Sequence, residues 1–200
     1  MGALSAELAE RLRAALLSSE DAEAIDAHGR TEAAVLVPLF EDDDGPGLVF
    51  TERRHDLRRH AGEISFPGGR RDHPGEELHE TALREAHEEI GLDPKSVELV
   101  GALPPIGTFV TNYKVHPFVG LIGDERALRP NPAEVESILH VHLDALRDAY
   151  EMRRLVRRGV PFKTPTYEVD RHLIWGATAR ILEEFFERLD SRGPAGEVSK

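Results

Sequence analysis

Apolar and polar positions alternate along the chain with two different periods, and together these periods predict a mixed α/β domain. Short apolar runs bounded by turn residues predict strands, whereas apolar residues three or four positions apart predict amphipathic helices. The predicted strands are residues 31–40, 48–51, 97–102, 114–122 and 138–143, with a strand pair within 163–173. The predicted helices are one helix within 1–29, followed by a polar connector, and the segments 76–90, 144–158 and 178–189.

Proline and acidic residues refine this pattern at two places. Pro117 falls inside the strand 114–122 and lacks a donor for the ladder, so this strand is expected at an edge or a bulge. The segment 41–47 is rich in Asp, Gly and Pro and is expected to be a turn. Its acidic triplet 42–44 resembles a metal cluster, but beside Gly-Pro-Gly it fits a solvated hairpin tip better.

The densest chemical information lies in the stretch 66–92, which begins with Phe66-Pro67-Gly68-Gly69 and continues into the helix 76–90. Proline fixes φ and glycine permits close backbone approach, so the first part is a shaped loop. The helix has acidic residues in its first turn and a glycine directly after its end. Its apolar positions form one stripe that should pack on a core: Leu78, Ala82, Leu83, Ala86 and Ile90.

Three glutamates lie at i, i+3 and i, i+4 spacing near the C-terminal end of this helix. Glu85, Glu88 and Glu89 should therefore form one exposed carboxylate face. The helix dipole is negative there and like charges repel, so a cation should offset them. Arg84, within helical reach of Glu80 and Glu88, is one candidate. A divalent cation is the other, and hard oxygen ligands suit Mg²⁺ or Mn²⁺.

Taken alone, such a glutamate cluster is most often a solvated helix face, but its wider context is more specific. Glu76, seven intervening residues, and then Arg84-Glu85-Ala86-His87-Glu88-Glu89-Ile90-Gly91-Leu92 resemble the sequence box of the Nudix hydrolases. Ala86 is smaller than the usual aliphatic residue. Six residues, where the box has five, separate Gly69 from Glu76, so Glu77 or Asp72 could share the role of Glu76.

The resemblance implies a Nudix-type α/β/α sandwich with a mixed sheet and one central catalytic helix. It further implies hydrolysis of a nucleoside-linked diphosphate, dependent on Mg²⁺ or Mn²⁺. The metal ligands it implies are Glu85, Glu89, Glu88 and the carbonyl of Gly69. Glu88 would ligate a second metal or orient water, and Arg84 would hold the carboxylates. Glu134 would add a further carboxylate, although a helix-cap or surface role fits that residue equally well.

A basic stretch interrupts an otherwise acidic chain of formal charge −12. Residues 52–65 and the two positions after the glycine turn are arginine-rich, which fits either a surface loop or a phosphate cradle, and their flanking of the turn favours the cradle. The net charge argues against a nucleic-acid partner. The expected substrate contacts are Arg53, Arg58, Arg59, His60, Gly68 and Arg70.

A second resemblance concerns the substrate. The pattern from Thr51 through Leu57, Gly62, Glu63 and Phe66 to the two glycines is similar to that of the coenzyme A pyrophosphatase branch of the family. That branch also shares the lengthened box and a closing stretch similar to 174–182. The resemblance implies cleavage of coenzyme A or acyl-coenzyme A to 3′,5′-ADP and (acyl-)4′-phosphopantetheine. The alternatives are a Nudix enzyme acting on ADP-ribose, dinucleoside polyphosphates or damaged nucleotides, and a non-catalytic nucleotide-sensing module.

The composition of the chain predicts its compartment. The sequence contains no cysteine, no N-terminal apolar region and no apolar run of membrane-spanning length, so a cytoplasmic protein without a membrane partner is expected. The predicted organisation is an N-terminal helical extension over 1–30, a Nudix domain over 31–190 and a disordered tail over 191–200. The N-terminal helix is expected to serve packing or a homodimer surface.

Overall fold

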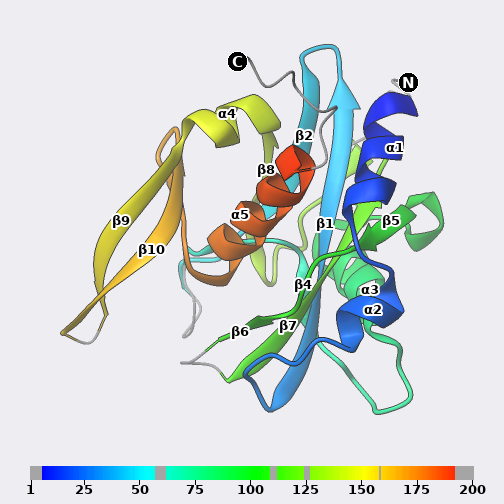
Figure 1. The fold of residues 1–200 in the computed structure, drawn as a ribbon, viewed down its shortest axis with the longest axis horizontal. Coiled ribbons are helices and arrows are strands. Elements are labelled where there is room, and N and C mark those ends of the chain that lie inside the picture. The colour runs from blue at the N-terminus through cyan, green and yellow to red at the C-terminus, as the bar shows by residue number, and fades with distance from the viewer. Residues whose placement is uncertain (1–5, 57–61, 109–111, 124–126, 158, 192–200) are drawn as a thin grey trace, which may run out of the picture.

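The computed structural model describes residues 6–56, 62–108, 112–123, 127–157 and 159–191, and they form an α/β/α sandwich (Figure 1). A mixed sheet lies between helix α3 on one face and helices α1 and α5 on the other. Its strands are β1 (Thr31–Asp42), β2 (Gly45–Arg53), β3 (Ile64–Ser65), β4 (Gly68–Arg70), β5 (Glu98–Ala102), β6 (Ile106–Gly107), β7 (Tyr113–Leu121) and β8 (Val135–His142). The helices are α1 (Ala6–Ala15), α2 (Ser19–Glu23), α3 (Leu78–Ile90), the 3₁₀ turn η1 (Pro94–Ser96), α4 (Leu143–Asp148) and α5 (Gly176–Ser191). This architecture confirms the predicted fold class.

Strand β1 supplies both apolar layers because successive side chains of a strand point to opposite faces. Ala33, Val37 and Leu39 pack in the core cluster that contains α1 and α5. The alternating positions Ala34, Leu36 and Phe40 pack in the cluster beneath α3. A strand covered on both faces reads as a continuous apolar run, which is how residues 31–40 appear in the sequence.

Strand β7 is central, so the predicted edge position was wrong. It pairs in parallel with β1 along its whole length and antiparallel with β5 and β6 on its other side. Pro117 is tolerated because it lies between the segments paired with β5 and with β6. There, the Pro117 carbonyl accepts a hydrogen bond from the backbone N–H of Leu103.

Strands β1 and β2 pair only beside their shared hairpin and then separate. The paired positions are 39–42 with 45–48, so the strands reach into the segment that was expected to be a turn. Farther along, β3 pairs with β2 and β4 pairs with β1. The glycine turn therefore lies in the split between the two strands, and helix α3 packs against β1 and β4. At the hairpin tip, the Asp42 carboxylate accepts a hydrogen bond from the Asp44 N–H and contacts His142.

A second, three-stranded sheet has the order β11-β10-β9 and carries a hairpin that projects from the body (Figure 1). Its strands are β9 (Tyr150–Arg157), β10 (Val160–Val169) and β11 (His172–Ile174). The strand pair predicted within 163–173 is confirmed. The helix predicted over 144–158 was wrong beyond Asp148, because pairing with β10 draws the following residues into a strand. Tyr167 is buried in the core.

The N-terminal region forms two short helices where one was expected. Leu17 forms an isolated bridge with Ala102 between α1 and α2 and interrupts the helix. Ala9, Leu12 and Ala15 of α1 are buried, and the helix contacts α5 and β5. Packing is thus the observed role of α1. The division at residue 30 stays a prediction. Of the predicted tail 191–200, Ser191 is the last residue of α5, and residues 192–200 lie outside the described residues.

Candidate active site

Helix α3 carries the carboxylates and ends sharply beside them. Gly91 follows the helix in the left-handed conformation, with φ of 67°, and its N–H bonds to the His87 carbonyl. The predicted apolar stripe is confirmed, because Leu78, Ala82, Ala86 and Ile90 are buried and Leu83 packs against the same cluster. The expectation of an exposed carboxylate face holds only for Glu88, whose side chain is 55% exposed. Glu85 is 18% exposed and Glu89 only 8%.

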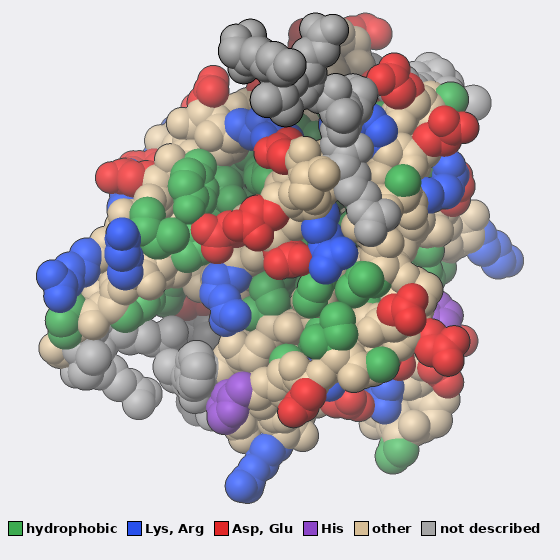
Figure 2. All heavy atoms as spheres, in the orientation of Figure 1, with side chains coloured by type: hydrophobic (Ala, Val, Ile, Leu, Met, Phe, Trp, Pro, Cys, Tyr) green, Lys and Arg blue, Asp and Glu red, His purple; other side chains and the backbone are tan. Residues whose placement is uncertain are grey.

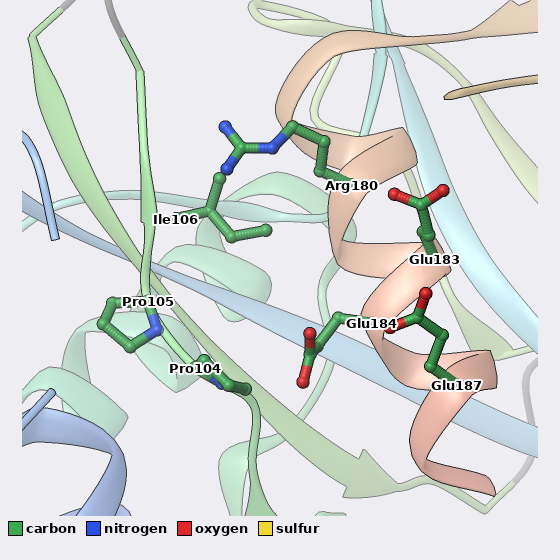
Figure 3. Close-up of a pocket in the computed structure, with 7 residues that line it drawn as sticks. All are labelled: Pro104, Pro105, Ile106, Arg180, Glu183, Glu184 and Glu187. Carbon is green, nitrogen blue, oxygen red and sulfur yellow. The ribbon is translucent and has the colours of Figure 1, made fainter. Parts of the chain in front are cut away.

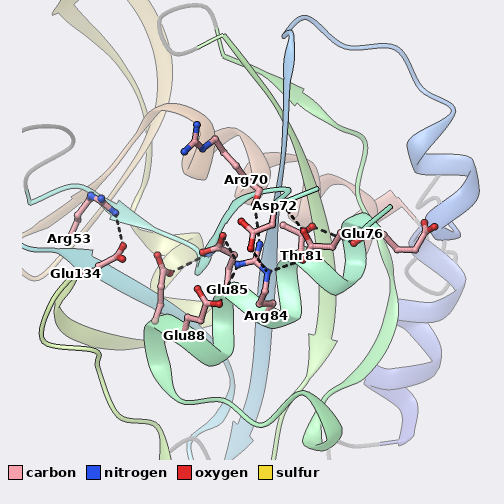
Figure 4. A network of polar contacts seen from close by, with 12 residues as sticks. Arg53, Arg70, Asp72, Glu76, Thr81, Arg84, Glu85, Glu88 and Glu134 are labelled. Atoms are coloured by element: carbon pink, nitrogen blue, oxygen red, sulfur yellow. Dashed lines mark hydrogen bonds and ion pairs between the residues drawn. The ribbon is translucent and has the colours of Figure 1, made fainter. Parts of the chain in front are cut away.

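Arg84 ties the helix to the loop before it (Figure 4). Its Nε donates to Glu76 at 2.8 Å, and one terminal nitrogen lies 3.1 Å from Glu85 and 3.4 Å from Glu88. The other terminal nitrogen donates to the backbone carbonyl of Arg70 at 3.0 Å. A planar guanidinium can bind several acceptors at once in this way. The sequence-based pairing with Glu80 was wrong, since Glu80 accepts the N–H of Glu77 at the start of the helix.

Glu76 is the partner of Arg84 despite the extra residue in the loop. Its second carboxylate oxygen accepts the backbone N–H of Asp72 at 2.8 Å. The hydrogen bond from Arg84 lowers the pKa of Glu76 to about 2, against the opposing effect of burial. The Asp72 carboxylate lies farther from Arg84, at 3.7 Å. The lengthened loop therefore still places an ionised carboxylate against the arginine.

The two glycines of the turn lie directly against the helix carboxylates. The Gly68 N–H donates to Glu89 Oε2 at 3.2 Å. At Gly69, an added Cβ would stand 2.3 Å from Glu85 Oε1, so the Glu85 carboxylate occupies the space of the missing side chain. Gly68 is constrained differently, because a Cβ there would meet the Ala34 carbonyl oxygen at 2.3 Å. Each glycine permits one close approach, the first to β1 and the second to the carboxylate.

Glu89 is buried, and no basic side chain among the described residues forms an ion pair with it. Desolvation raises its pKa to about 8, and the carboxylates of Glu85 and Glu134 raise it further, whereas the Gly68 N–H and Arg53 oppose the shift. Burial also raises the pKa of Glu85, with Arg84 opposing. A buried carboxylate is costly to ionise unless it is paired or binds a metal. The described residues around Glu89 and Glu85 therefore supply too little positive charge to stabilise both carboxylates in their ionised form.

Arg53 and Glu134 face the same region from outside the helix. Arg53, the last residue of β2, lies 3.8 Å from the Glu134 carboxylate in the loop before β8 (Figure 4). That loop is fixed on β2 because the Arg54 N–H bonds to the Glu134 carbonyl at 3.1 Å. The sequence indicated neither this ion pair nor this attachment. Arg70 is exposed at the end of β4, and its side chain points away from the helix carboxylates in Figure 4. The expected contacts Arg58, Arg59 and His60 lie outside the described residues.

The donor set suits a divalent cation. Glu85 and Glu89 offer hard oxygen ligands of the kind that Mg²⁺ and Mn²⁺ prefer, and a cation there would remove the cost of ionising the buried Glu89. Within the described residues, however, no three acidic or histidine side chains form a ready-made metal cluster. The residues that fit a metal are therefore present, and their side chains would have to adjust to coordinate it.

The fold and the site together define a class: an α/β/α domain whose central helix presents carboxylates to a glycine turn held between two diverging strands. The NUDIX domain family model matches residues 30–159, and the chain belongs to the Nudix family. A relative named "Uncharacterized Nudix hydrolase NudL" from Pectobacterium atrosepticum is 35% identical over 170 residues, covering 82% of this chain and 86% of the relative. A protein of the same name from Citrobacter koseri is 39% identical over 157 residues, with 78% and 81% covered.

Solved structures agree on the fold. A Nudix hydrolase from M. smegmatis, RenU, superposes with a TM-score of 0.58 at 15% identity, covering 86% of this chain and 92% of that one. A MutT/nudix family protein from Enterococcus faecalis gives 0.57 at 14% identity, with 96% and 76% covered. Nudix hydrolases act on nucleoside diphosphate derivatives and generally use divalent cations such as Mg²⁺ or Mn²⁺.

Proposed function

We propose that this Nudix hydrolase cleaves the diphosphate of coenzyme A or acyl-coenzyme A and releases 3′,5′-ADP and (acyl-)4′-phosphopantetheine. The observation that carries the proposal is the pattern from Thr51 to Gly69, which resembles the coenzyme A pyrophosphatase branch, together with the placement of its glycine turn in the fold. The described part of that segment supplies the end of β2, strand β3 and the glycine turn at the start of β4, and the turn lies against the carboxylates of α3. The glycine turn, which belongs to the branch pattern, thus adjoins the helix that carries the sequence box of the family.

The proposed metal ligands are Glu85, Glu89, Glu88 and the Gly69 carbonyl. A bound Mg²⁺ or Mn²⁺ would neutralise charge on the diphosphate and acidify a water for attack at phosphorus. The chain's own part is to hold the carboxylates still. The Gly68 N–H orients Glu89, and Arg84 fixes Glu85 and Glu88 against the turn. Such supporting contacts commonly contribute 10- to 100-fold to activity or metal affinity.

Arg53 and Glu134 are proposed to act on the substrate side of the same site. Their separation of 3.8 Å is too long for a tight ion pair, so Arg53 can turn toward a phosphate oxygen without losing a strong partner. Glu134 would then be free to ligate metal or to accept a proton from water. Cytoplasmic localisation, and the absence of nucleic-acid and membrane partners, stay predictions from composition. No helix among the described residues is long and apolar enough to cross a bilayer.

A substrate panel tests the proposal. Purified protein is incubated with coenzyme A, acetyl-coenzyme A, ADP-ribose and a dinucleoside polyphosphate, each with Mg²⁺, with Mn²⁺ and with excess chelator. Separation of the products by chromatography identifies the bond that is cut. We expect the highest kcat/KM for coenzyme A or its acyl form and reversible loss of turnover on chelation. A clear preference for ADP-ribose or a dinucleotide would assign the chain to another branch, and full turnover in chelator would refute metal dependence.

A further inference from the structure

The hairpin formed by β9 and β10 exposes apolar side chains away from the core. Among the described residues, four large hydrophobic side chains are exposed, and three of them lie on β9: Tyr150 at 44%, Met152 at 38% and Val156 at 69%. An exposed apolar cluster of this kind commonly marks an interaction surface. The hairpin also projects from the body (Figure 1), so a partner can approach it freely.

Two positive charges stand directly opposite each other on this hairpin. Arg154 pairs in register with Lys163, and the neighbouring pairs on the same face are Met152 with Pro165 and Val156 with Pro161. Like charges in directly opposed strand positions are unfavourable. Within the described part of the chain, neither Arg154 nor Lys163 has an ion pair. By contrast, Arg153 on the other face contacts both Glu151 and Glu168 at 2.6 Å.

The basic pair borders a hollow of about 380 Å³ lined by Met152, Arg154, Pro161, Phe162 and Lys163. We call this the hairpin patch. A partner surface that is both apolar and acidic would bury the apolar side chains of this patch and form ion pairs with its two cations. Such a surface exists on the same molecule.

The outer side of α5 forms a second hollow of about 210 Å³ against the segment before β7 (Figure 3). We call it the α5 patch, and its lining residues are Pro104, Pro105, Ile106, Arg180, Glu183, Glu184 and Glu187. Glu184 is paired with Arg188 at 2.6 Å, and Glu183 accepts a hydrogen bond from the Tyr150 hydroxyl at 2.9 Å. Glu187 is exposed and has no ion pair within the described residues.

The two patches adjoin, because the Tyr150–Glu183 hydrogen bond joins the base of the hairpin to α5. Figure 2 shows both on one face: Lys and Arg side chains gather with apolar ones over the projecting hairpin at the left, and acidic side chains gather over α5 nearer the centre. A face that carries two adjoining, mutually complementary patches can pair with its own copy around a two-fold axis.

We infer that the protein forms a symmetric homodimer in which the hairpin patch of each copy docks on the α5 patch of the other. Lys163 and Arg154 then contact Glu187 and Glu183 of the second copy. Met152 and Pro161 pack on its Pro104 and Pro105. The other route to a dimer, edge-to-edge pairing of two β9 strands, is disfavoured because it would bring the arginines of both edges together. This inference does not depend on the proposed activity.

Sedimentation velocity over a wide range of protein concentration tests the inference. We expect the wild type to be dimeric, and Lys163→Glu to raise the dimer dissociation constant roughly tenfold or more, as loss of a close interfacial charge pair does. Glu187→Lys should have a similar effect from the opposite patch. Mixing the two variants should restore a heterodimer, because the swapped charges attract again across one of its two contacts. Lys95→Glu, with the same charge change at an exposed position in η1, is the matched control and should stay dimeric.

Thermal unfolding of each variant verifies that it is folded. Because the two charge variants lie on different elements, the inference can still be tested if one of them does not fold. A wild type that stays monomeric at every concentration refutes the inference, as does a dimer that neither substitution weakens. A dimer weakened equally by Lys95→Glu would show only a general charge effect, and failure of the mixed variants to associate would refute the paired contact. Binding of the hairpin to an anionic vesicle or to RNA by a monomeric wild type would assign the basic pair to another partner.

Discussion

At the scale of single residues, the candidate site contrasts two buried carboxylates with different surroundings. Glu76 has a guanidinium and a backbone N–H as partners, and its pKa falls to about 2. Among the residues that the structure describes, Glu89 has only the Gly68 N–H as a direct partner, and its pKa rises to about 8. The first carboxylate is thus stabilised as an anion by the protein itself. The second has no such cationic partner within the described part of the chain, and it therefore gives the clearest test of metal binding.

Replacement of Glu89 by Gln should abolish turnover while the fold holds. The amide keeps an acceptor for the Gly68 N–H, and near neutral pH it replaces a carboxyl that is already largely protonated in the absence of a cation. We expect kcat to fall on the order of a hundredfold or more, since even supporting contacts contribute 10- to 100-fold. The melting temperature without metal should hold or rise.

Mn²⁺ gives a second readout for Glu89→Gln. A ligand that binds only the folded state raises its melting temperature, so Mn²⁺ should stabilise the wild type and leave the variant unchanged. Glu20→Gln, at an exposed position in α2, is the control. Activity of Glu89→Gln within threefold of the wild type would remove Glu89 from the metal site, and a collapsed melting temperature would make it structural.

His116 should give the folding equilibrium a distinct pH dependence. It is 2% exposed, neither ring nitrogen has a hydrogen-bond partner among the described residues, and burial lowers its pKa to about 4, with Lys114 and Arg71 adding to the shift. Between about pH 6.5 and 4 the unfolded chain takes up a proton that the folded chain does not. The free energy of unfolding should therefore decrease as the pH is lowered from about 6.5 to 4, by about 3 kcal/mol in all.

His116→Leu tests this dependence by removing both the titration and the unpaired polar atoms. Urea unfolding at several pH values should show a flatter dependence than in the wild type and equal or higher stability near pH 7. His73→Gln, at an exposed histidine, serves as the comparison and should keep the wild-type slope. If His116→Leu also kept that slope, His116 would be protonated in the folded state at acid pH, in conflict with its burial.

At the scale of elements, the sequence predicts best where the determinants are local. Helix α3 has a capping glycine, a regular apolar stripe and few breakers within its own residues, so its limits were predicted to within two residues. Strand β9 was predicted as helix because Leu, Arg, Met and Glu favour helix locally, and only pairing with the distant β10 overrides that preference. The same limit applies to the site. Helical spacing alone brought Glu85, Glu88 and Glu89 together, but burial of Glu89 and the approach of Arg53 to Glu134 depend on β4 and β2.

The two adjacent glycines of the turn should respond differently to alanine. A Cβ at Gly69 meets only the carboxylate end of Glu85, which can swing away, so Gly69→Ala should fold normally and lose activity. A Cβ at Gly68 meets the backbone of Ala34 and Val35, which cannot yield easily, so Gly68→Ala should lose roughly 1–3 kcal/mol of stability or more.

Unfolding and kinetic measurements on both glycine variants would distinguish the roles. Gly123→Ala, where a Cβ meets nothing within 4 Å, is the control and should behave like the wild type. Equal loss of stability in Gly69→Ala and Gly68→Ala would mean that the Glu85 carboxylate is held too firmly to move. Full activity in Gly69→Ala would mean that its position against the turn is not needed for turnover.

At the scale of the whole molecule, charge is distributed unevenly. The chain carries a formal charge of −12, yet its candidate site adjoins Arg53 and Arg70. The net charge repels an anionic substrate at long range, so local cations must reverse the field near the carboxylates. A diphosphate neutralised by bound metal ions would require only part of that positive charge. The remainder suits a second phosphate group at a distance from the bond that is cut.

Coenzyme A should therefore be a better substrate than dephospho-coenzyme A, which lacks only the 3′-phosphate. One charge-assisted hydrogen bond to phosphate contributes roughly 1.5–3 kcal/mol, which corresponds to about tenfold or more in kcat/KM. Arg70 is exposed beside the turn, and its guanidinium has no ion pair within the described residues, so Arg70→Ala should remove most of the preference and leave dephospho-coenzyme A hydrolysis nearly unchanged. Arg171→Ala, at an exposed arginine in the turn before β11, should leave both rates at the wild-type level. Equal wild-type rates on the two substrates would show that the arginines serve the diphosphate alone, and would favour a generic nucleoside-diphosphate substrate over coenzyme A.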